Sequence, residues 1–191
     1  MRILAGAHKG RRLLAPPSGS GTRPITSLVK KSLFDMLGGR LEGAVVVDLY
    51  CGTGTLGLEA LSRGAERVCF AERDRLVLSR LRRNIEALGA ADRCEVWAGD
   101  VAASLRRRLA GPVDVAFVDP PYAQARRWSW QAASDMILAP LAERLAPDGV
   151  VVVRVPAGCE PPDELGALAV RRRRRYGEMA LALLGRREES A

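Results

Sequence analysis

The segment Asp119-Pro120-Pro121-Tyr122 combines a carboxylate, two rigid residues and an aromatic ring directly after an apolar run. The end of a strand at two prolines and the packing of a tyrosine would explain only part of it. Alkylation of a nucleobase amine explains all four residues. The Asp119 carboxylate and the Pro120 carbonyl could bind the two N–H hydrogens and stabilise the positive charge that develops on nitrogen. Tyr122 could stack on a base taken out of its helix, which contributes about 1–3 kcal/mol.

A second segment carries glycines in the spacing Gly52-x-Gly54-x-x-Gly57. With an acidic residue about 20 positions later, this spacing matches a dinucleotide-binding loop. Asp48 favours another ligand, because a carboxylate at the end of the strand would repel a pyrophosphate and attract an ammonium group. S-adenosylmethionine has an ammonium group, a cationic sulfonium and no phosphate. We therefore expect Asp48, Gly52, Thr53 and Gly54 to bind S-adenosylmethionine, with S-adenosylhomocysteine as the product.

Two further acids, Glu72 and Asp100, close the next two apolar runs. The carboxyl ends of neighbouring parallel strands are where open α/β sheets bind ligands. Glu72 could accept both ribose hydroxyls, and Asp100 could meet the adenine edge. Taken singly, Asp48 and Glu72 could be solvated acids and Asp100 a helix N-cap. Three acids at successive strand ends beside one glycine loop favour a cofactor site.

The elements that position these residues alternate between apolar runs and helical stretches from residue 44 onward. This alternation predicts an α/β fold with a doubly wound, seven-stranded and mostly parallel sheet. The strands are predicted at Val45–Leu49, Val68–Ala71, Glu95–Ala98, Val113–Val118, Val150–Val155, Leu168–Arg174 and Met179–Leu184. The helices are predicted near Leu56–Arg63, Leu76–Leu88, Val101–Leu109 and Ala132–Leu145. The last two strands flank Tyr176-Gly177-Glu178 and should form an antiparallel hairpin at one edge of the sheet.

Residues 1–43 are predicted to be a basic extension that precedes a catalytic domain of residues 44–191. Arg2 to Leu14 should form a small β-hairpin around a turn bounded by glycines. Thr26–Leu37 should form a helix, because its apolar residues recur at helical spacing on one face.

With both chemical segments in view, the chain resembles the bacterial 16S (small-subunit) ribosomal RNA guanine-N2 methyltransferase family. This family lies within the Rossmann-like, class I S-adenosylmethionine-dependent methyltransferases. The resemblance covers nearly the whole chain and includes Arg2-Ile3-Leu4-Ala5-Gly6, Lys9-Gly10-Arg11, Arg23-Pro24, Gly57 to Ala65 and Tyr176-Gly177-Glu178. It implies methyl transfer to the N2 amine of a guanine in 16S rRNA, which could be naked or part of an assembling ribonucleoprotein particle.

One segment departs from the family pattern. After Arg23-Pro24 the family usually has Thr-Thr-Asp-Arg-Val-Arg-Glu, whereas this chain has Ile25-Thr26-Ser27-Leu28-Val29-Lys30-Lys31. Two acids are lost and a lysine is gained, so any role of those acids in positioning cofactor or base must be filled differently. Cys51 stands where alanine is common, which we interpret as packing.

The formal net charge of +8 is concentrated at the two ends of the chain. Residues 1–43 carry eight Lys or Arg and two acids, residues 171–191 carry seven and three, and residues 44–170 carry fifteen and seventeen. This distribution is typical of an enzyme that binds a polyanion outside its catalytic centre. The residues expected to hold RNA are Arg2, Lys9, Arg11, Arg12, Arg23, Lys30 and Lys31. Arg171–Arg175 would alternate between the faces of a strand, and could be a solvated run.

The composition and the cysteine pattern exclude several classes of protein. Apolar residues make up 48% and charged residues 27% of the chain, which is globular composition. No window reaches the roughly 18 apolar residues of a membrane span, and the first residues lack the apolar core of a signal peptide. Cys51, Cys69, Cys94 and Cys159 lack zinc spacing. We expect a cytoplasmic, monomeric enzyme without a metal, in which His8 has no catalytic role.

Three other functions stay open at this point. An adenine-N6 methyltransferase acting on DNA or RNA would use the same Asp119 to Tyr122 segment. Against it, only about 27 residues separate Tyr122 from the next strand, which leaves no room for an inserted target-recognition domain. A Rossmann-type oxidoreductase is opposed by Asp48, and a non-catalytic RNA-binding module would leave the Asp119 segment without a purpose.

Overall fold

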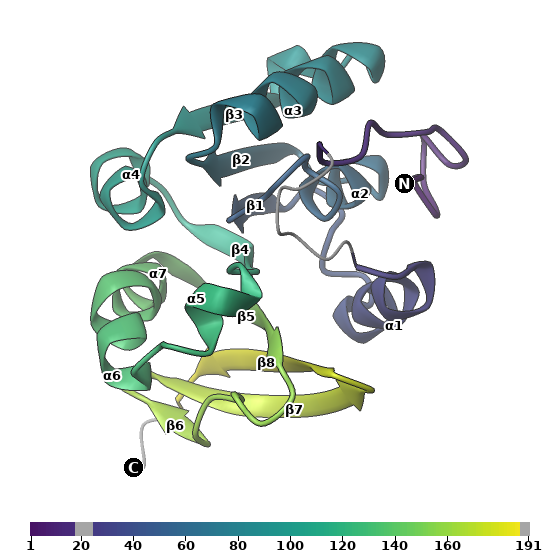
Figure 1. Cartoon of the computed structure of the whole chain (residues 1–191). Coiled ribbons are helices and arrows are strands. Elements are labelled where there is room, and N and C mark those ends of the chain that lie inside the picture. The colour runs from purple at the N-terminus through teal and green to yellow at the C-terminus, as the bar shows by residue number, and fades with distance from the viewer. Residues whose placement is uncertain (18–24, 188–191) are drawn as a thin grey trace.

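The computed structural model describes residues 1–17 and 25–187, which form one sheet with helices on both faces (Figure 1). The strands are β1 (Val45–Leu49), β2 (Arg67–Glu72), β3 (Cys94–Ala98), β4 (Val113–Val118), β5 (Leu145–Pro156), β6 (Glu164–Leu165), β7 (Leu168–Tyr176) and β8 (Met179–Arg186). The helices are α1 (Ser27–Leu37), α2 (Gly57–Ser62), α3 (Arg75–Ala87), α4 (Val101–Arg108), α5 (Tyr122–Ala125), α6 (Trp130–Ala133) and α7 (Ala139–Arg144), with a 3-10 turn η1 (Ala91–Arg93) and a π-helical turn η2 (Ser134–Leu138).

The strand order is β3-β2-β1-β4-β5-β8-β7-β6. The first five strands in this order are parallel, and β8, β7 and β6 continue the sheet in antiparallel fashion. The predicted doubly wound α/β fold with a C-terminal antiparallel hairpin is confirmed. The predicted number of seven strands is wrong, because the two-residue β6 pairs with Leu168 and Ala169 at the edge. So short a strand carries no periodic pattern of its own.

Side chains alternate between the two faces of the sheet, and each face has its own core. One face, which we call the site face, carries Val46, Phe70, Phe117 and Val152 and is covered by α1, α2, α3 and the N-terminal segment. The opposite face carries Val47, Ala116 and Val153 and is covered by α4, η2 and α7. In Figure 1 the two helical layers stand on the right and the left of the sheet.

Most predicted boundaries lie within two residues of the observed ones, and the largest difference precedes β5. The helix predicted over Ala132–Leu145 is observed as α6, η2 and α7 in succession. The strand that follows begins at Leu145, five residues earlier than predicted. Its pairing with β4 shifts register between Val113 and Val115, which brings the apolar run from Val150 into line with β4.

The N-terminal segment forms the predicted hairpin with a single bridge, between Arg2 and Arg12, rather than with full strands. Ile3 N–H donates to the Arg11 carbonyl at 3.0 Å, and Leu13 N–H donates to the Met1 carbonyl at 2.9 Å. Ile3 and Leu13 are buried in the same core as α1 and α2, so residues 1–17 and the sheet share one interior. No helix within residues 1–17 and 25–187 has the length and hydropathy that a membrane crossing requires.

Candidate active site

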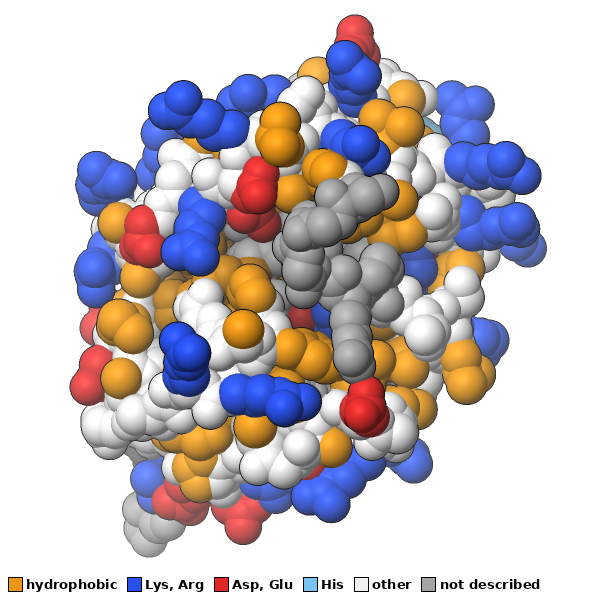
Figure 2. Space-filling model, in the orientation of Figure 1, with side chains coloured by type: hydrophobic (Ala, Val, Ile, Leu, Met, Phe, Trp, Pro, Cys, Tyr) orange, Lys and Arg blue, Asp and Glu red, His pale blue; other side chains and the backbone are white. Residues whose placement is uncertain are grey.

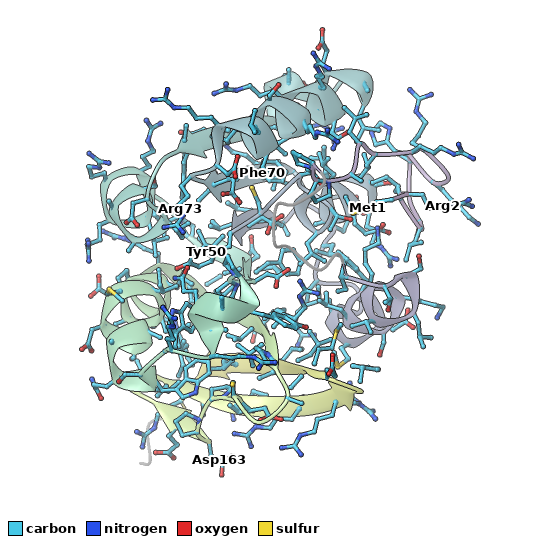
Figure 3. The ribbon with its side chains drawn as sticks, viewed as in Figure 1. Met1, Arg2, Tyr50, Phe70, Arg73 and Asp163 are labelled. Atoms are coloured by element: carbon cyan, nitrogen blue, oxygen red, sulfur yellow. The ribbon has the colours of Figure 1, made fainter. Side chains whose placement is uncertain are left out.

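A cleft opens at the carboxyl ends of β1, β2, β4 and β5, where open α/β sheets bind their ligands. It is lined by Met1, Pro16, Ile25, Tyr50, Cys51, Gly52, Thr53, Thr55, Glu72, Arg73, Asp74, Val77, Asp119, Pro120, Pro121, Tyr122 and Arg154. The space inside it, including the part open to solvent, is about 970 Å³, within the roughly 300–1,000 Å³ of small-molecule sites. Figure 3 shows Met1 on one side of the molecule's centre and Tyr50 with Arg73 on the other.

The register of the sheet explains why the charged side chains gather there. Val118 of β4 pairs with Val153 of β5, and both belong to the opposite face. Asp119 and Arg154, each one residue later, therefore share the site face. The same alternation places Asp48 beside Phe70 and Phe117, which lie in the site-face core, and Glu72 two residues beyond Phe70.

The glycine loop is tied to the sheet by two carboxylates. Asp48 is buried, and its Oδ2 accepts a hydrogen bond from Gly57 N–H at 2.8 Å, while its Oδ1 has no partner among residues 1–17 and 25–187. Burial raises the pKa of Asp48 to about 8; the bond from Gly57 opposes this shift, and the charges of Asp119 and Glu72 add to it. Glu72 accepts from Gly52 N–H at 3.1 Å and from the N–H groups of Arg73 and Asp74 at 2.8 and 2.9 Å. The two acids thus set the position of the loop.

Two of the glycines are required by close packing. Gly54 has a φ of +83°, and a Cβ there would lie 2.5 Å from the Leu81 side chain of α3. A Cβ at Gly57 would lie 2.4 Å from the ring of Phe70, so α2 can approach β2 only because this residue has no side chain. Directly before Gly54, Thr53 lines the cleft, and its buried Oγ1 has no partner in the described part of the chain.

The other end of the cleft contains an ion pair between two almost buried side chains. Arg154 Nε donates to Asp119 Oδ1 at 2.6 Å, with side-chain exposures of 8% and 15%. Burial raises the pKa of Asp119, and the charge of Arg154 and its hydrogen bond oppose that shift. The guanidinium carbon lies 5.7 Å from the centre of the Tyr122 ring, within the range of a cation–π contact. Arg154 therefore stabilises the ionised form of Asp119 where solvent cannot.

The carbonyl groups of the two prolines differ in their hydrogen bonds within the described part of the chain. The Pro121 carbonyl accepts from Gln124 and Ala125 at the start of α5. No backbone or side-chain donor within residues 1–17 and 25–187 bonds to the carbonyl of Pro120. The Asp119 carboxylate and the Pro120 carbonyl, one residue apart beside the Tyr122 ring, can accept hydrogen bonds from both N–H groups of one planar amine.

Comparison with known proteins places the chain in a family. The profile of a family described as "Conserved hypothetical protein 95" matches residues 1–185. The chain belongs to this family. A Bacillus subtilis (strain 168) relative, named "Putative rRNA methyltransferase YlbH", is 33% identical over 190 residues, which are 98% of this chain and 100% of that protein.

Two further relatives of this family member come from Escherichia coli. The "Ribosomal RNA small subunit methyltransferase D" of strain K12 is 38% identical over 122 residues, which are 64% of this chain and 60% of that protein. The solved structure titled "Putative methyltransferase yhhF from Escherichia coli" is 29% identical, with a TM-score of 0.78 over 97% of both chains. The family resemblance predicted from the sequence is confirmed.

In this family member the predicted site residues are only partly brought together. Gly52, Thr53, Glu72 and the whole Asp119 to Tyr122 segment line the cleft. Asp48 and Gly54 lie behind the lining, and Asp48 contacts the loop instead of the open space. Asp100 is exposed, caps α4 by accepting from Ala103 N–H at 2.9 Å and is not among the lining residues.

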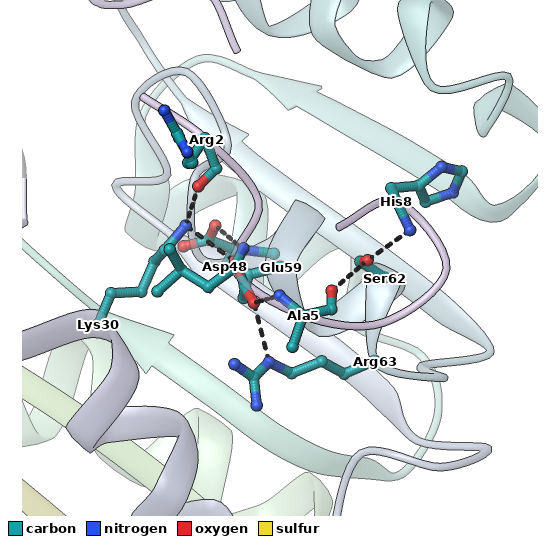
Figure 4. A network of polar contacts seen from close by, with 10 residues as sticks. Arg2, Ala5, His8, Lys30, Asp48, Glu59, Ser62 and Arg63 are labelled. Carbon is teal, nitrogen blue, oxygen red and sulfur yellow. Dashed lines mark hydrogen bonds and ion pairs between the residues drawn. The ribbon is translucent and has the colours of Figure 1, made fainter. Parts of the chain in front are cut away.

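The prediction that Lys30 holds RNA is wrong. Its ammonium is buried, 2.9 Å from Glu59 Oε2, and donates to the Arg2 carbonyl at 2.7 Å (Figure 4). Lys31 is exposed and paired with Asp35 across one helical turn. Arg2, Lys9, Arg11 and Arg12 are exposed, and basic side chains crowd the corresponding right-hand edge of Figure 2. Arg23 lies outside the described residues.

The network around Glu59 docks the N-terminal segment on α2. Besides Lys30, this buried carboxylate accepts from Leu4 N–H at 2.7 Å, Ala5 N–H at 3.0 Å and Arg63 Nε at 2.9 Å. Ser62 next to it donates to the Ala5 carbonyl at 2.6 Å (Figure 4). The network therefore holds in place the segment whose first residue lines the cleft.

Sequence reasoning missed Arg154 and Tyr50 as residues of the cleft. Arg154 was detectable, because it is the one charged residue in the apolar run Val150–Val155. Tyr50 adopts a φ of +59° directly after β1, which turns the chain away from the sheet into the glycine loop. Its hydroxyl accepts a hydrogen bond from Gln124 at 3.1 Å.

Proposed function

We propose that the protein transfers a methyl group from S-adenosylmethionine to the exocyclic N2 amine of a guanine in 16S ribosomal RNA. One observation carries this proposal. Two acceptors, the Asp119 carboxylate and the Pro120 carbonyl, lie at one end of a cleft whose other end is the glycine loop. The names of the relatives support both the reaction and the class of RNA.

The residues at the glycine loop fit a cationic cofactor without phosphate. Three carboxylates, Glu72, Asp74 and Asp119, line the cleft together with two guanidinium groups, Arg73 and Arg154, of which Arg154 is paired with Asp119. The buried Asp48 lies behind the loop, and its Oδ1 has no partner in the described part of the chain. A dinucleotide would bring its pyrophosphate into this acidic surrounding. When bound, S-adenosylmethionine supplies a methyl group on a cationic sulfur. Glu72 would hold the ribose hydroxyls through Oε2, which accepts only one backbone hydrogen bond, and Gly52 and Thr53 would line the space beside it.

Asp48 and Asp100 have supporting roles in this proposal. Asp48 fixes the start of α2 through Gly57, and so sets where the glycine loop stands. Asp100 lies near the cleft residue Tyr50. Burial raises the pKa of Tyr50, and the charge of Asp100 raises it further. Gly54 allows α3 to pack against the loop. These residues position the cofactor site and do not line it.

At the acceptor end the chain prepares the amine for attack. The Asp119 carboxylate and the Pro120 carbonyl accept hydrogen bonds from the two N–H groups of the amine, which draws the nitrogen lone pair out of conjugation with the ring. The fixed φ of the prolines holds the carbonyl in place, and Tyr122 provides the stacking face for the base. Arg154 favours the ionised form of Asp119 through one oxygen, Oδ1, which leaves Oδ2 for the amine. After transfer, the excess proton of the alkylated nitrogen can leave along the hydrogen bond to Asp119.

The proposed substrate also sets the surroundings in which the protein works. We propose that the protein works in the cytoplasm, where small-subunit ribosomal RNA is found alone or in an assembling particle, and that it acts as a monomer and binds this RNA through basic side chains. Of the predicted set, Arg2, Lys9 and Arg12 are exposed for this purpose, and Arg11 is exposed but also donates to the Ala87 carbonyl at 3.0 Å.

The decisive test is transfer of labelled methyl groups to under-methylated 16S RNA, offered naked and as assembled particle. The product is digested to nucleosides and identified by mass. We expect N2-methylguanosine; N6-methyladenosine would assign the site to an adenine-N6 methyltransferase instead. An Asp119→Ala variant should bind S-adenosylmethionine as the wild type does and lose at least about 100-fold in transfer rate. Equal loss of cofactor binding and transfer would contradict the role given to Asp119.

A further inference from the structure

We propose that Arg172 and Arg174 of β7 bind the phosphate backbone of the RNA strand that flanks the target nucleotide. The proposal rests on the proposed function for the nature of the polyanion. It assigns a contact surface to two of the five consecutive arginines Arg171–Arg175. The face of the sheet separates them from Arg173 and Arg175, and a bulge in the strand separates them from Arg171.

The pairing of β7 with β8 decides which arginines project from the site face of the sheet. The register shifts between Val170 and Arg172, so that Arg171 forms a bulge. After the bulge, Arg172 pairs with Leu183 and Arg174 pairs with Leu181. Both leucines belong to the site-face core, so both arginines project from the site face.

The other three arginines are already engaged. Arg173 pairs with Ala182 of the opposite face and binds Asp163 and the Pro161 carbonyl. Arg175 lies on the same face and binds Glu160 Oε1 at 2.5 Å. Arg171 donates to the Arg186 carbonyl at 2.6 Å. Asp163, labelled in Figure 3, marks this lower edge of the molecule.

Arg172 and Arg174 differ from these three in their surroundings. Both are exposed, and neither has an ion pair or hydrogen bond within residues 1–17 and 25–187. Along β7 the run therefore contains three engaged arginines, of which Arg173 and Arg175 hold the segment before β6 and Arg171 bonds to β8, and two arginines that are available to a ligand.

The available pair lies level with the catalytic end of the cleft. Leu181 pairs with Arg174 on one side and with Arg154 on the other, so the three residues form one row across β7, β8 and β5. Two strand spacings separate the backbones of Arg174 and Arg154, or about 10 Å. Arg154 contacts Asp119, and an RNA strand with its base at Tyr122 can therefore continue over β8 to β7.

The chemistry of the pair suits phosphate groups. Guanidinium groups bind phosphates in a bidentate manner, and two side chains on one face of a strand stand about 7 Å apart. This separation is comparable with that of successive phosphates along one RNA strand. The pair adds to the exposed basic side chains of the N-terminal segment on the other side of the cleft, so RNA would be held on both sides of the target base.

The test compares two double variants of the full chain with equal loss of charge on the same strand. R172Q/R174Q removes the proposed phosphate contacts, and R173Q/R175Q is the matched control on the opposite face. Binding of under-methylated 16S RNA is measured against salt concentration, with thermal unfolding and S-adenosylmethionine binding as checks of the fold. R172K/R174K keeps the charges and should retain most of the salt dependence.

We expect R172Q/R174Q to lower the slope of log affinity against log salt by about 1.4–1.8, or roughly 30-fold in affinity at 0.1 M salt. The control should change the slope by less than half of that. An equal loss in both double variants, or no loss in either, would overturn the proposal. Competition by polyglutamate as strong as by poly(U) at equal charge would also overturn it and assign the surface to an acidic protein.

Failure of the proposed function would look different. If R172Q/R174Q weakens RNA binding more than R173Q/R175Q does, but the wild type transfers no methyl group to the RNA, the proposed reaction is refuted and the contact surface is supported. A wild-type protein that methylates guanine, with both double variants equally impaired in RNA binding, would support the reaction and refute the contact surface.

Discussion

Replacement of Glu59 by glutamine should destabilise the protein more than any exposed charge substitution. Its two carboxylate oxygens each accept one backbone N–H and one cationic donor, from Lys30 and Arg63 respectively. A glutamine can face only one of these pairs with oxygen, so its amide NH2 group must point at two donors on the other side. The Lys30 ammonium, only 4% exposed, then loses its counter-charge.

The size of the effect follows from this burial. Breaking a buried ion pair while leaving one partner in place costs about 3–5 kcal/mol. Whole domains are stable by only about 5–15 kcal/mol, so E59Q should remove a large part of the free energy of unfolding. For a chain of this size the melting temperature should fall by roughly 6–20 °C. The N-terminal segment should exchange its amide hydrogens faster than the rest of the protein, because the bonds to Leu4 and Ala5 are lost.

The assay is urea unfolding of the wild type, E59Q, Lys30→Met and the double variant. Lys30→Met removes the buried charge itself, so the double variant should be less destabilised than the sum of the single variants, by about 1–3 kcal/mol. Glu95→Gln is the control, since this 36% exposed acid pairs with Arg67 at 2.9 Å on the surface and should cost about 0–1 kcal/mol. A cost of E59Q below 1 kcal/mol, or additivity with Lys30→Met, would refute the reasoning.

Three further predictions concern the cleft. Arg154→Met should move the acidic limb of the pH–rate profile to higher pH, because burial raises the pKa of Asp119 and Arg154 opposes this; Arg154→Lys should move it less, and an unchanged limb in both would exclude the positioning role. Burial raises the pKa of Asp48 in the folded protein to about 8, so the folded wild type should lose stability as pH rises from 4 to 8 and Asp48→Asn should not. The free energy of unfolding of Asp48→Asn should therefore increase relative to that of the wild type over this range. A difference between the two free energies that stays constant with pH would contradict the buried carboxyl. Tyr122→Ala should weaken binding of the target RNA by about 1–3 kcal/mol in direct titration, whereas Tyr122→Phe, which keeps the stacking ring, should bind as the wild type does.

The sequence by itself was enough to predict the fold and the segment Asp119 to Tyr122 as part of a ligand site. Apolar runs of five or six residues, separated by helical stretches, are enough to predict parallel strands, because both faces of such a sheet are buried. A motif that follows a strand directly, such as Asp119 to Tyr122, then has only one place to lie. Its carboxylate and carbonyl line the cleft because they continue β4 by one and two residues.

The tertiary structure decided which charged side chains are available, since availability depends on partners far away in the sequence. Lys30 reads as one of two adjacent surface lysines, but α1 turns it toward Glu59 of α2, which makes it part of the interior. Asp48 reads as a ligand, but α2 begins so close to it that one oxygen caps Gly57. The arginine run reads as uniform, and only the bulge in β7 and its register with β8 determine that Arg172 and Arg174 project from the site face. Burial and pairing are long-range properties, and local residue patterns do not encode them.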